Sequence, residues 1–107
     1  MSRDLGAAVF AALSDPTRRE IVMSLSESGE TSATELAQHL PVTRQAVVKH
    51  LAALADAGLV EAQRRGREKL YRLTPRPLED AVSWMAEVGA QWDERLQALR
   101  AHLGPED

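Results

Sequence analysis

Residues 41–60 read PVTRQAVVKHLAALADAGLV. In this segment apolar side chains recur at helical spacing, and the basic side chains lie in its N-terminal half. After a turn begun by Pro41, we expect Thr43 to cap a helix. Gly58 fits the left-handed position that ends it. We expect the inner face to consist of Ala46, Val47, Leu51, Leu54 and Ala55. The segment therefore predicts a helix that is buried along one side and exposed near its N-terminus.

A shorter helix is predicted directly before this one. Ser32 and Glu35 have the spacing of a capping box, and the apolar residues after them carry the helix to about Leu40. Two helices joined by a tight turn form the helix-turn-helix arrangement, in which the second helix enters the DNA major groove. The spacing alone is moderately specific, because similar helix pairs occur in proteins that bind no DNA.

The outward residues near the start of the second helix have the chemistry needed to contact DNA. Arginine can bridge guanine O6 and N7, glutamine can bridge adenine N6 and N7, and valine can touch a thymine methyl group. A helix N-terminus also favours a nearby phosphate. The residues expected to contact DNA from this helix are Thr43, Arg44, Gln45, Val48 and Lys49.

Residues 59–75, LVEAQRRGREKLYRLTP, predict a two-stranded hairpin, or wing. The Arg65-Gly66 pair suits a tight turn that needs positive φ, and Tyr71 and Leu73 share one face of the returning strand. We expect the tip to lie along the DNA backbone or in the minor groove. Its contact residues would be Arg64, Arg65, Arg67 and Lys69. Alternatively, these cations only keep an exposed hairpin soluble and protect its edges.

Charge is distributed unevenly along the 107 residues. The net charge is −3, yet residues 41–76 carry 8 basic and 3 acidic side chains. The flanking segments 1–40 and 77–107 have net charges of −3 and −5. The potential near a surface is set by charges within a Debye length of about 8–10 Å. The basic middle third therefore suits a polyanionic partner, unless it is a chance cluster of solvated charges.

Two helices are predicted before the helix-turn-helix. Residues 5–13 place apolar side chains on one helical stripe. Asp15 then has the position of an N-cap, and Pro16 that of the first helical residue, where the missing N–H costs nothing. The buried face of this second helix is expected to contain Ile21, Val22 and Leu25.

The C-terminal region predicts one long helix from Pro77, with Glu79 and Asp80 in its first turn. Apolar residues and Gly89 alternate at spacings of 4 and 3, which is a heptad seam: Leu78, Val82, Met85, Gly89, Trp92, Leu96, Leu99 and Leu103. At 1.5 Å per residue, the helix is about 39 Å long, more than the small winged body can cover. A second chain is the expected cover. Gly89 marks close backbone approach across a dimer or is simply tolerated.

Metal and enzyme chemistry are not indicated. The chain has no cysteine, and His39, His50 and His102 lack the spacing of metal ligands. Asp80 and His102 would be about 33 Å apart on one helix, so only two chains could bring them together, and this question stays open. Without a phosphate loop, nucleophile elbow or paired carboxylates, we expect no enzyme, cofactor or metal. No segment is long enough to span a bilayer, so a soluble, cytoplasmic protein is expected.

Three runs resemble the ArsR family of bacterial winged-helix transcriptional repressors: LSDPTRREIVMSL, ELAQHLPVTRQAVVKHLAALADAGLV and RRGREKLYRLTP. The resemblance covers nearly the whole chain. The resemblance implies a homodimer, built from the first and last helices, on a palindromic operator. The interface residues that it implies are Leu5, Val9, Val82, Met85, Gly89, Trp92, Leu96 and Leu99. The chain departs from the family pattern by lacking metal-sensing cysteines and by having Val48 where a small hydroxyl residue is frequent. The C-terminal tail, RPLEDAVSWMAEVGAQWDERLQALRAHL, resembles a non-metal branch of the family.

We therefore expect a single mainly α domain, a winged helix-turn-helix, over residues 1–107. Its parts are dimerisation helices at 1–14 and 77–103, the helix-turn-helix at 32–58 and the wing at 59–74. The expected function is a homodimeric, sequence-specific repressor that binds double-stranded DNA. The alternative is a winged-helix module that binds proteins and not DNA. The sequence leaves open the operator, the regulated genes and the existence of a small-molecule effector.

Overall fold

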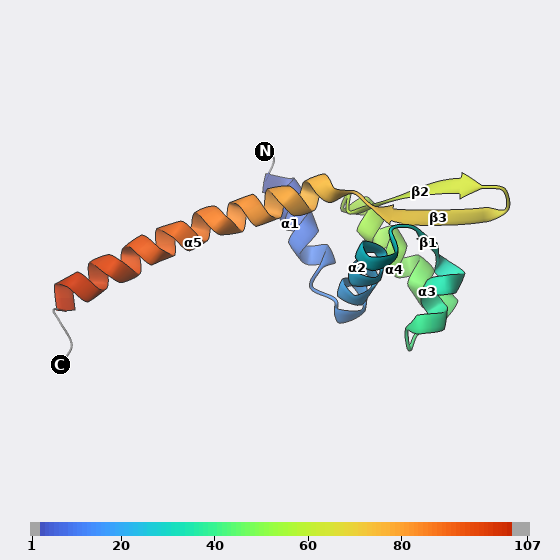
Figure 1. Ribbon diagram of the computed structural model, residues 1–107, viewed down its shortest axis with the longest axis horizontal. Coiled ribbons are helices and arrows are strands. Elements are labelled where there is room, and N and C mark those ends of the chain that lie inside the picture. The colour runs from blue at the N-terminus through green and yellow to red at the C-terminus, as the bar shows by residue number, and fades with distance from the viewer. Residues whose placement is uncertain (1–2, 104–107) are drawn as a thin grey trace.

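The computed structural model describes residues 3–103, with side-chain surroundings from residue 7 onward. The body of the fold contains four shorter helices, and a hairpin and a long helix extend from it at opposite ends (Figure 1). In chain order the elements are α1 (Arg3–Ala12), α2 (Pro16–Ser28), β1 (Thr31–Ser32), α3 (Ala33–His39), α4 (Arg44–Asp56), β2 (Val60–Arg65), β3 (Glu68–Leu73) and α5 (Pro75–Leu103). The molecule is elongated, with extents of 66 × 31 × 20 Å.

The N-cap of α2 is the predicted Asp15. Its carboxylate accepts hydrogen bonds from the backbone N–H groups of Thr17 at 2.8 Å and Arg18 at 3.1 Å, and Pro16 takes the first helical position. The bond from the Arg18 N–H, followed by that from Thr17 and the nearby charges of His50 and Arg18, holds the pKa of Asp15 below its ordinary value, although burial acts in the opposite direction. The helix ends at Gly29, which has a φ of 84°.

The core lies where α1, α2 and α4 meet beneath the start of the wing. It includes the predicted apolar faces of α2 and α4, and its fully buried large side chains are Val9, Ile21, Leu25, Val47, Leu51, Leu54 and Leu59. Of the inner face predicted for α4, Ala55 is exposed instead, and the buried residues at that end of the helix are Leu54 and Ala57. Ala57 and Gly58 end the helix, and Gly58 has the expected positive φ of 79°.

The wing belongs to a sheet of three strands, where the sequence predicted two. The order is β1-β3-β2 and both pairings are antiparallel, so β3 is central. Thr31 pairs with Tyr71, and both side chains are buried. Two-residue β1 also leads into α3, because Ser32 accepts a hydrogen bond from the Glu35 N–H at 3.2 Å. The Glu35 carboxylate instead accepts from the Thr31 hydroxyl at 2.7 Å, so only half of the capping box forms.

The turn of the hairpin lies one residue later than predicted. Arg65 pairs with Glu68, which leaves Gly66 and Arg67 as its two central residues. Gly66 has a φ of 61°, whereas Arg67 has no positive φ. Positive φ at the first central residue alone is typical of a type II′ turn, which matches the twist of the flanking strands.

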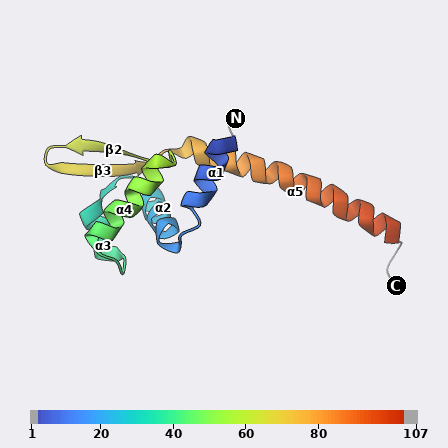
Figure 2. The ribbon, with the colours of Figure 1, turned by 180° about the vertical axis from the view of Figure 1, so that it is seen from behind.

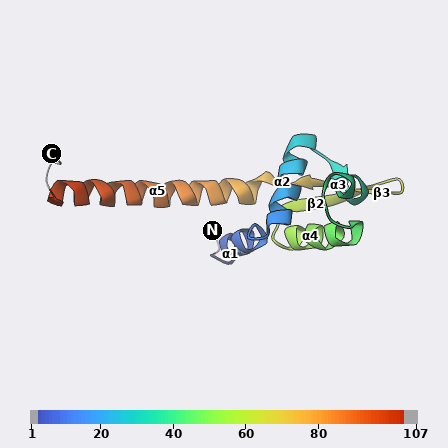
Figure 3. The ribbon, with the colours of Figure 1, turned by 90° about the horizontal axis from the view of Figure 1, so that it is seen from below.

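Helix α5 begins at Pro75, two residues before the predicted start, and spans 29 residues. At 1.5 Å per residue, it is about 43 Å long. Pro77 is buried inside the first turn, and the earlier start leaves that turn without the acidic residues predicted there. Figure 3 shows α5 running out on the side opposite the wing, with α1 close to its beginning. The rings of Phe10 and Trp84 join the two helices edge to face, 5.6 Å apart.

Candidate nucleic-acid interface

Helix α4 presents the predicted DNA-contacting residues on its solvent side. Thr43 caps it as expected, accepting a hydrogen bond from the Ala46 N–H at 3.1 Å, while Val47 and Leu51 hold the opposite face in the core. This fixes the first turn and the outward direction of its side chains. The candidate residues, all exposed, are Thr43, Arg44, Gln45, Val48 and Lys49. Figure 2 shows α3 and α4 side by side on this face of the molecule.

The wing carries its basic residues on two faces. Successive side chains of a strand alternate between faces, and the buried Tyr71 marks the face toward the body. Arg64 and Lys69, which pair across the hairpin, share that face. Arg65 lies on the other face, where its Nη1 is 3.2 Å from a carboxylate oxygen of Glu30.

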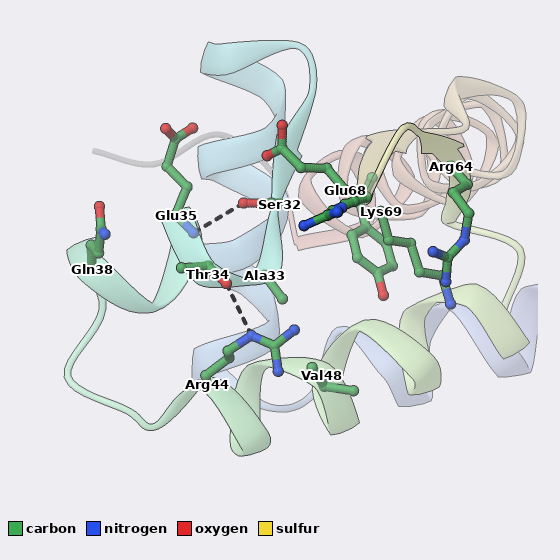
Figure 4. Close-up of a pocket in the computed structure, with 12 residues that line it drawn as sticks. Ser32, Ala33, Thr34, Glu35, Gln38, Arg44, Val48, Arg64, Glu68 and Lys69 are labelled. Carbon is green, nitrogen blue, oxygen red and sulfur yellow. Dashed lines mark hydrogen bonds between the residues drawn. The ribbon is translucent and has the colours of Figure 1, made fainter.

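A groove of about 620 Å³ separates α3 and α4 from the wing. Arg44 and Val48 line it from α4, and Arg64, Arg67 and Lys69 line it from the wing. Figure 4 shows the side chains of Arg44, Val48, Arg64 and Lys69 at this opening. Lys69 also lies over the ring of Tyr71, its Nζ 5.7 Å from the centroid. The groove thus brings together cations separated by about twenty positions in sequence.

Acidic and polar groups complete the lining. Glu35 and Glu68 face the same groove, so the four basic residues there outnumber the acidic ones. Thr34, the second residue of α3, accepts a hydrogen bond from Arg44 Nε at 3.0 Å. Thr34 is not among the residues predicted from the sequence, where its one signal is a hydroxyl group near the start of the shorter helix of the pair. Of the other predicted residues, the N-cap Thr43 and the α4 residues Gln45 and Lys49 do not line the groove, and Arg65 faces away from it.

A second candidate surface runs along α5. Five of the expected interface residues are 44–60% exposed: Val82, Met85, Trp92, Leu96 and Leu99. Gly89 lies among them, and a Cβ added there would meet nothing within 4 Å. The contact with α1 uses a neighbouring stripe, with Ala81 buried and Trp84 against Phe10. Val9 is 1% exposed, so it belongs to the core and offers almost no surface to a partner. Leu5 lies in α1, but its side chain falls outside the described residues.

Within residues 3–103, no three His, Asp or Glu side chains gather in a way that could hold a metal ion. Nor does any helix there combine the length and apolarity needed to cross a membrane.

The helix pair α3–α4, followed by a hairpin that borders the same groove, defines a winged helix-turn-helix protein. Comparisons with known proteins agree. The family described as bacterial regulatory protein, arsR family, matches residues 15–62. The chain belongs to this ArsR family and is a DNA-binding transcriptional regulator. Such regulators are not enzymes, as expected from the sequence.

The similarity extends beyond the matched segment. The transcriptional repressor SdpR of Bacillus subtilis (strain 168) is 35% identical over 88 residues, which are 82% of this chain and 97% of that protein. The arsenical resistance operon repressor of Escherichia coli (strain K12) is 33% identical over 103 residues, which are 96% of this chain and 88% of that protein. The solved structure of an ArsR-like transcriptional regulator from Rhodococcus sp. RHA1 has a TM-score of 0.82 and 44% identity, covering 96% of each chain.

Proposed function

We propose that the protein is a sequence-specific transcriptional repressor that acts as a homodimer on a palindromic operator. The groove between α4 and the wing carries this proposal, because cations from both elements line one opening. A duplex has one phosphate charge per about 1.7 Å of its axis, so such an opening favours its backbone. The names of two relatives, a transcriptional repressor and an operon repressor, support the direction of regulation.

In this proposal, α4 lies in the major groove and reads bases through Arg44, Gln45 and Val48. Arginine pairs with guanine, glutamine with adenine, and valine with a thymine methyl group. Thr43 and Lys49 contact flanking phosphates. The wing contributes Arg64, Arg67 and Lys69 to the backbone contacts, because these three line the groove.

The exposed apolar stripe of α5 supports the dimer. Large apolar side chains that remain exposed along one face of a helix are typical of an interaction surface. A second copy provides an identical stripe, as a two-fold interface requires. Two recognition helices held about 34–36 Å apart would then meet successive major grooves, so the operator consists of two inverted half-sites.

The test is selection of duplex DNA from a random library by the full chain. We expect the selected sequences to contain inverted half-sites with centres about 10 base pairs apart. Raising salt from about 50 to 200 mM should weaken binding by about 10³- to 10⁵-fold if 6–10 phosphates are neutralised. Failure to enrich any sequence, with binding that does not respond to salt, would favour the protein-binding alternative.

Substitutions in α4 separate base reading from general affinity. We expect Arg44→Ala or Gln45→Ala to reduce discrimination between the selected duplex and a shuffled one by about 1–3 kcal/mol for each lost base contact. Fluorescence anisotropy with both duplexes measures this difference. Equal losses on the two duplexes would refute the base-reading roles.

A further inference from the structure

One hydrogen bond joins the two helices of the helix-turn-helix through their exposed side chains. Arg44 Nε donates to Thr34 Oγ1 at 3.0 Å, across ten positions of sequence (Figure 4). Arg44 is the first residue of α4, and Thr34 is the second residue of α3. Both backbones are fixed by caps, Ser32 for α3 and Thr43 for α4. The geometry of the bond is therefore set by the fold, while its existence depends on one hydroxyl group.

The bond divides the donors of Arg44. A guanidinium has five N–H groups, one on Nε and four on the two terminal nitrogens. Thr34 engages the single hydrogen of Nε, and this is the one hydrogen bond of the Arg44 side chain within the described residues. The two terminal nitrogens remain available, and together they can span guanine O6 and N7. An arginine held at Nε can thus still read a base with the end of its fork.

We propose that Thr34 is a positioning residue, which orients the Arg44 guanidinium for base recognition before DNA binds. This proposal rests on the base-reading role of Arg44 given above. A free arginine side chain samples many rotamers and loses that freedom on binding. An arginine already held at Nε loses less conformational freedom on binding, and the fixed plane of its guanidinium group favours one base over others. Thr34 would therefore contribute to discrimination between sequences without touching a base.

The test uses substitutions of the full chain that change one hydroxyl group. Thr34→Val removes the hydroxyl and keeps the branched shape, whereas Thr34→Ser keeps the hydroxyl. Arg44→Ala, alone and combined with Thr34→Val, reports whether Thr34 acts through Arg44. Binding of each variant to the duplex selected by the unsubstituted chain, and to a shuffled duplex, is measured by fluorescence anisotropy. Circular dichroism on heating checks that each variant folds as the unsubstituted chain does.

We expect Thr34→Val to lower the affinity ratio of selected to shuffled duplex by about 3- to 10-fold, the range for loss of one net hydrogen bond. Thr34→Ser should restore the ratio, and Thr34→Val should have no further effect in the Arg44→Ala background. When the selection is repeated with Thr34→Val, the base preference should weaken at the same position where Arg44→Ala abolishes it.

Three results would overturn the inference. The first is an unchanged ratio in Thr34→Val while Arg44→Ala loses discrimination, which would leave the proposed function intact. The second is an equal loss of affinity for both duplexes in Thr34→Val that persists in the Arg44→Ala background. This result would indicate a direct contact between Thr34 and phosphate. In the third, Arg44→Ala itself discriminates normally, and then the base-reading role fails together with the inference.

Discussion

Arg64 and Arg65 are neighbours in sequence, yet they face opposite sides of the wing. Arg64 borders the groove with Lys69, whereas Arg65 is paired with Glu30, whose side chain is 25% exposed. Neighbouring basic residues of a strand therefore do not form one charged surface. This division could be predicted from the sequence, because only residues two apart in a strand share a face. The partner of Arg65 could not be found in the same way, since Glu30 reaches it only through the folding of the sheet.

These two arginines give a matched pair of substitutions. We expect Arg64→Ala to weaken binding to random duplex DNA and to lower the slope of log affinity against log salt by about one. Arg65→Ala should change both quantities less, because its charge is already balanced by Glu30 on the other face. Fluorescence anisotropy at several salt concentrations measures both. Equal effects of the two substitutions would mean that Arg65 exchanges Glu30 for phosphate.

Asp15 links stability to pH. Its pKa is lowered in the folded protein, first by the hydrogen bond from the Arg18 N–H. The stabilisation is therefore complete above the ordinary pKa of a carboxyl and is lost as pH falls through the lower folded value. Asp15→Asn keeps a capping side chain but does not titrate. We expect the stability advantage of the unsubstituted chain over Asp15→Asn to shrink between about pH 7 and pH 3 in urea unfolding. If the unsubstituted chain and Asp15→Asn lost the same amount of stability as pH fell, this prediction would be wrong.

At the scale of elements, sequence predicted best where one residue ends or begins a helix. Asp15, Ser32, Thr43 and Gly58 all have their expected places, because capping depends on neighbours within three or four residues. The start of α5 was misplaced because both Pro75 and Pro77 fit a first helical turn. Strand β1 could not be predicted, since its two residues form a strand only by pairing with β3, forty residues later.

The wing turn depends on the backbone of one residue. Gly66 has a φ of 61°, and a Cβ there would meet nothing within 4 Å, so substitution costs conformational energy alone. We expect Gly66→Ala to destabilise the hairpin by about 1–2 kcal/mol, seen as faster amide hydrogen exchange in β2 and β3. Arg67→Ala, at the other central position, should leave exchange nearly unchanged because its φ is not positive. Similar exchange rates in both variants would contradict this explanation.

At the scale of the whole molecule, α5 carries more apolar surface than its own chain covers. Periodicity predicted this stripe correctly as a helical seam, and its side chains from Val82 to Leu99 remain about half exposed. It did not predict that α1 packs on the neighbouring stripe through Phe10 and Trp84. That arrangement requires knowledge of where α1 lies, which local spacing does not contain. The seam thus remains free for the proposed second copy.

A charge in the seam should prevent dimerisation. We expect Leu96→Glu to yield monomers with weak operator affinity, because pairing would bury an unpaired carboxylate on each chain. Gln97→Glu adds the same charge at the next, exposed position, off the seam, and should remain dimeric. Sedimentation of both variants measures the oligomeric state. A dimeric Leu96→Glu protein would exclude this stripe from the interface.

The junction between the wing and α5 is a single residue. Thr74 alone separates β3 from α5, and its N–H donates to the Leu59 carbonyl at 2.8 Å, beside the point where α4 ends. Because one residue joins them, the direction of the hairpin is tied to the direction of α5. In the proposed homodimer, the angle at which two α5 helices cross would therefore set the distance between the two wings.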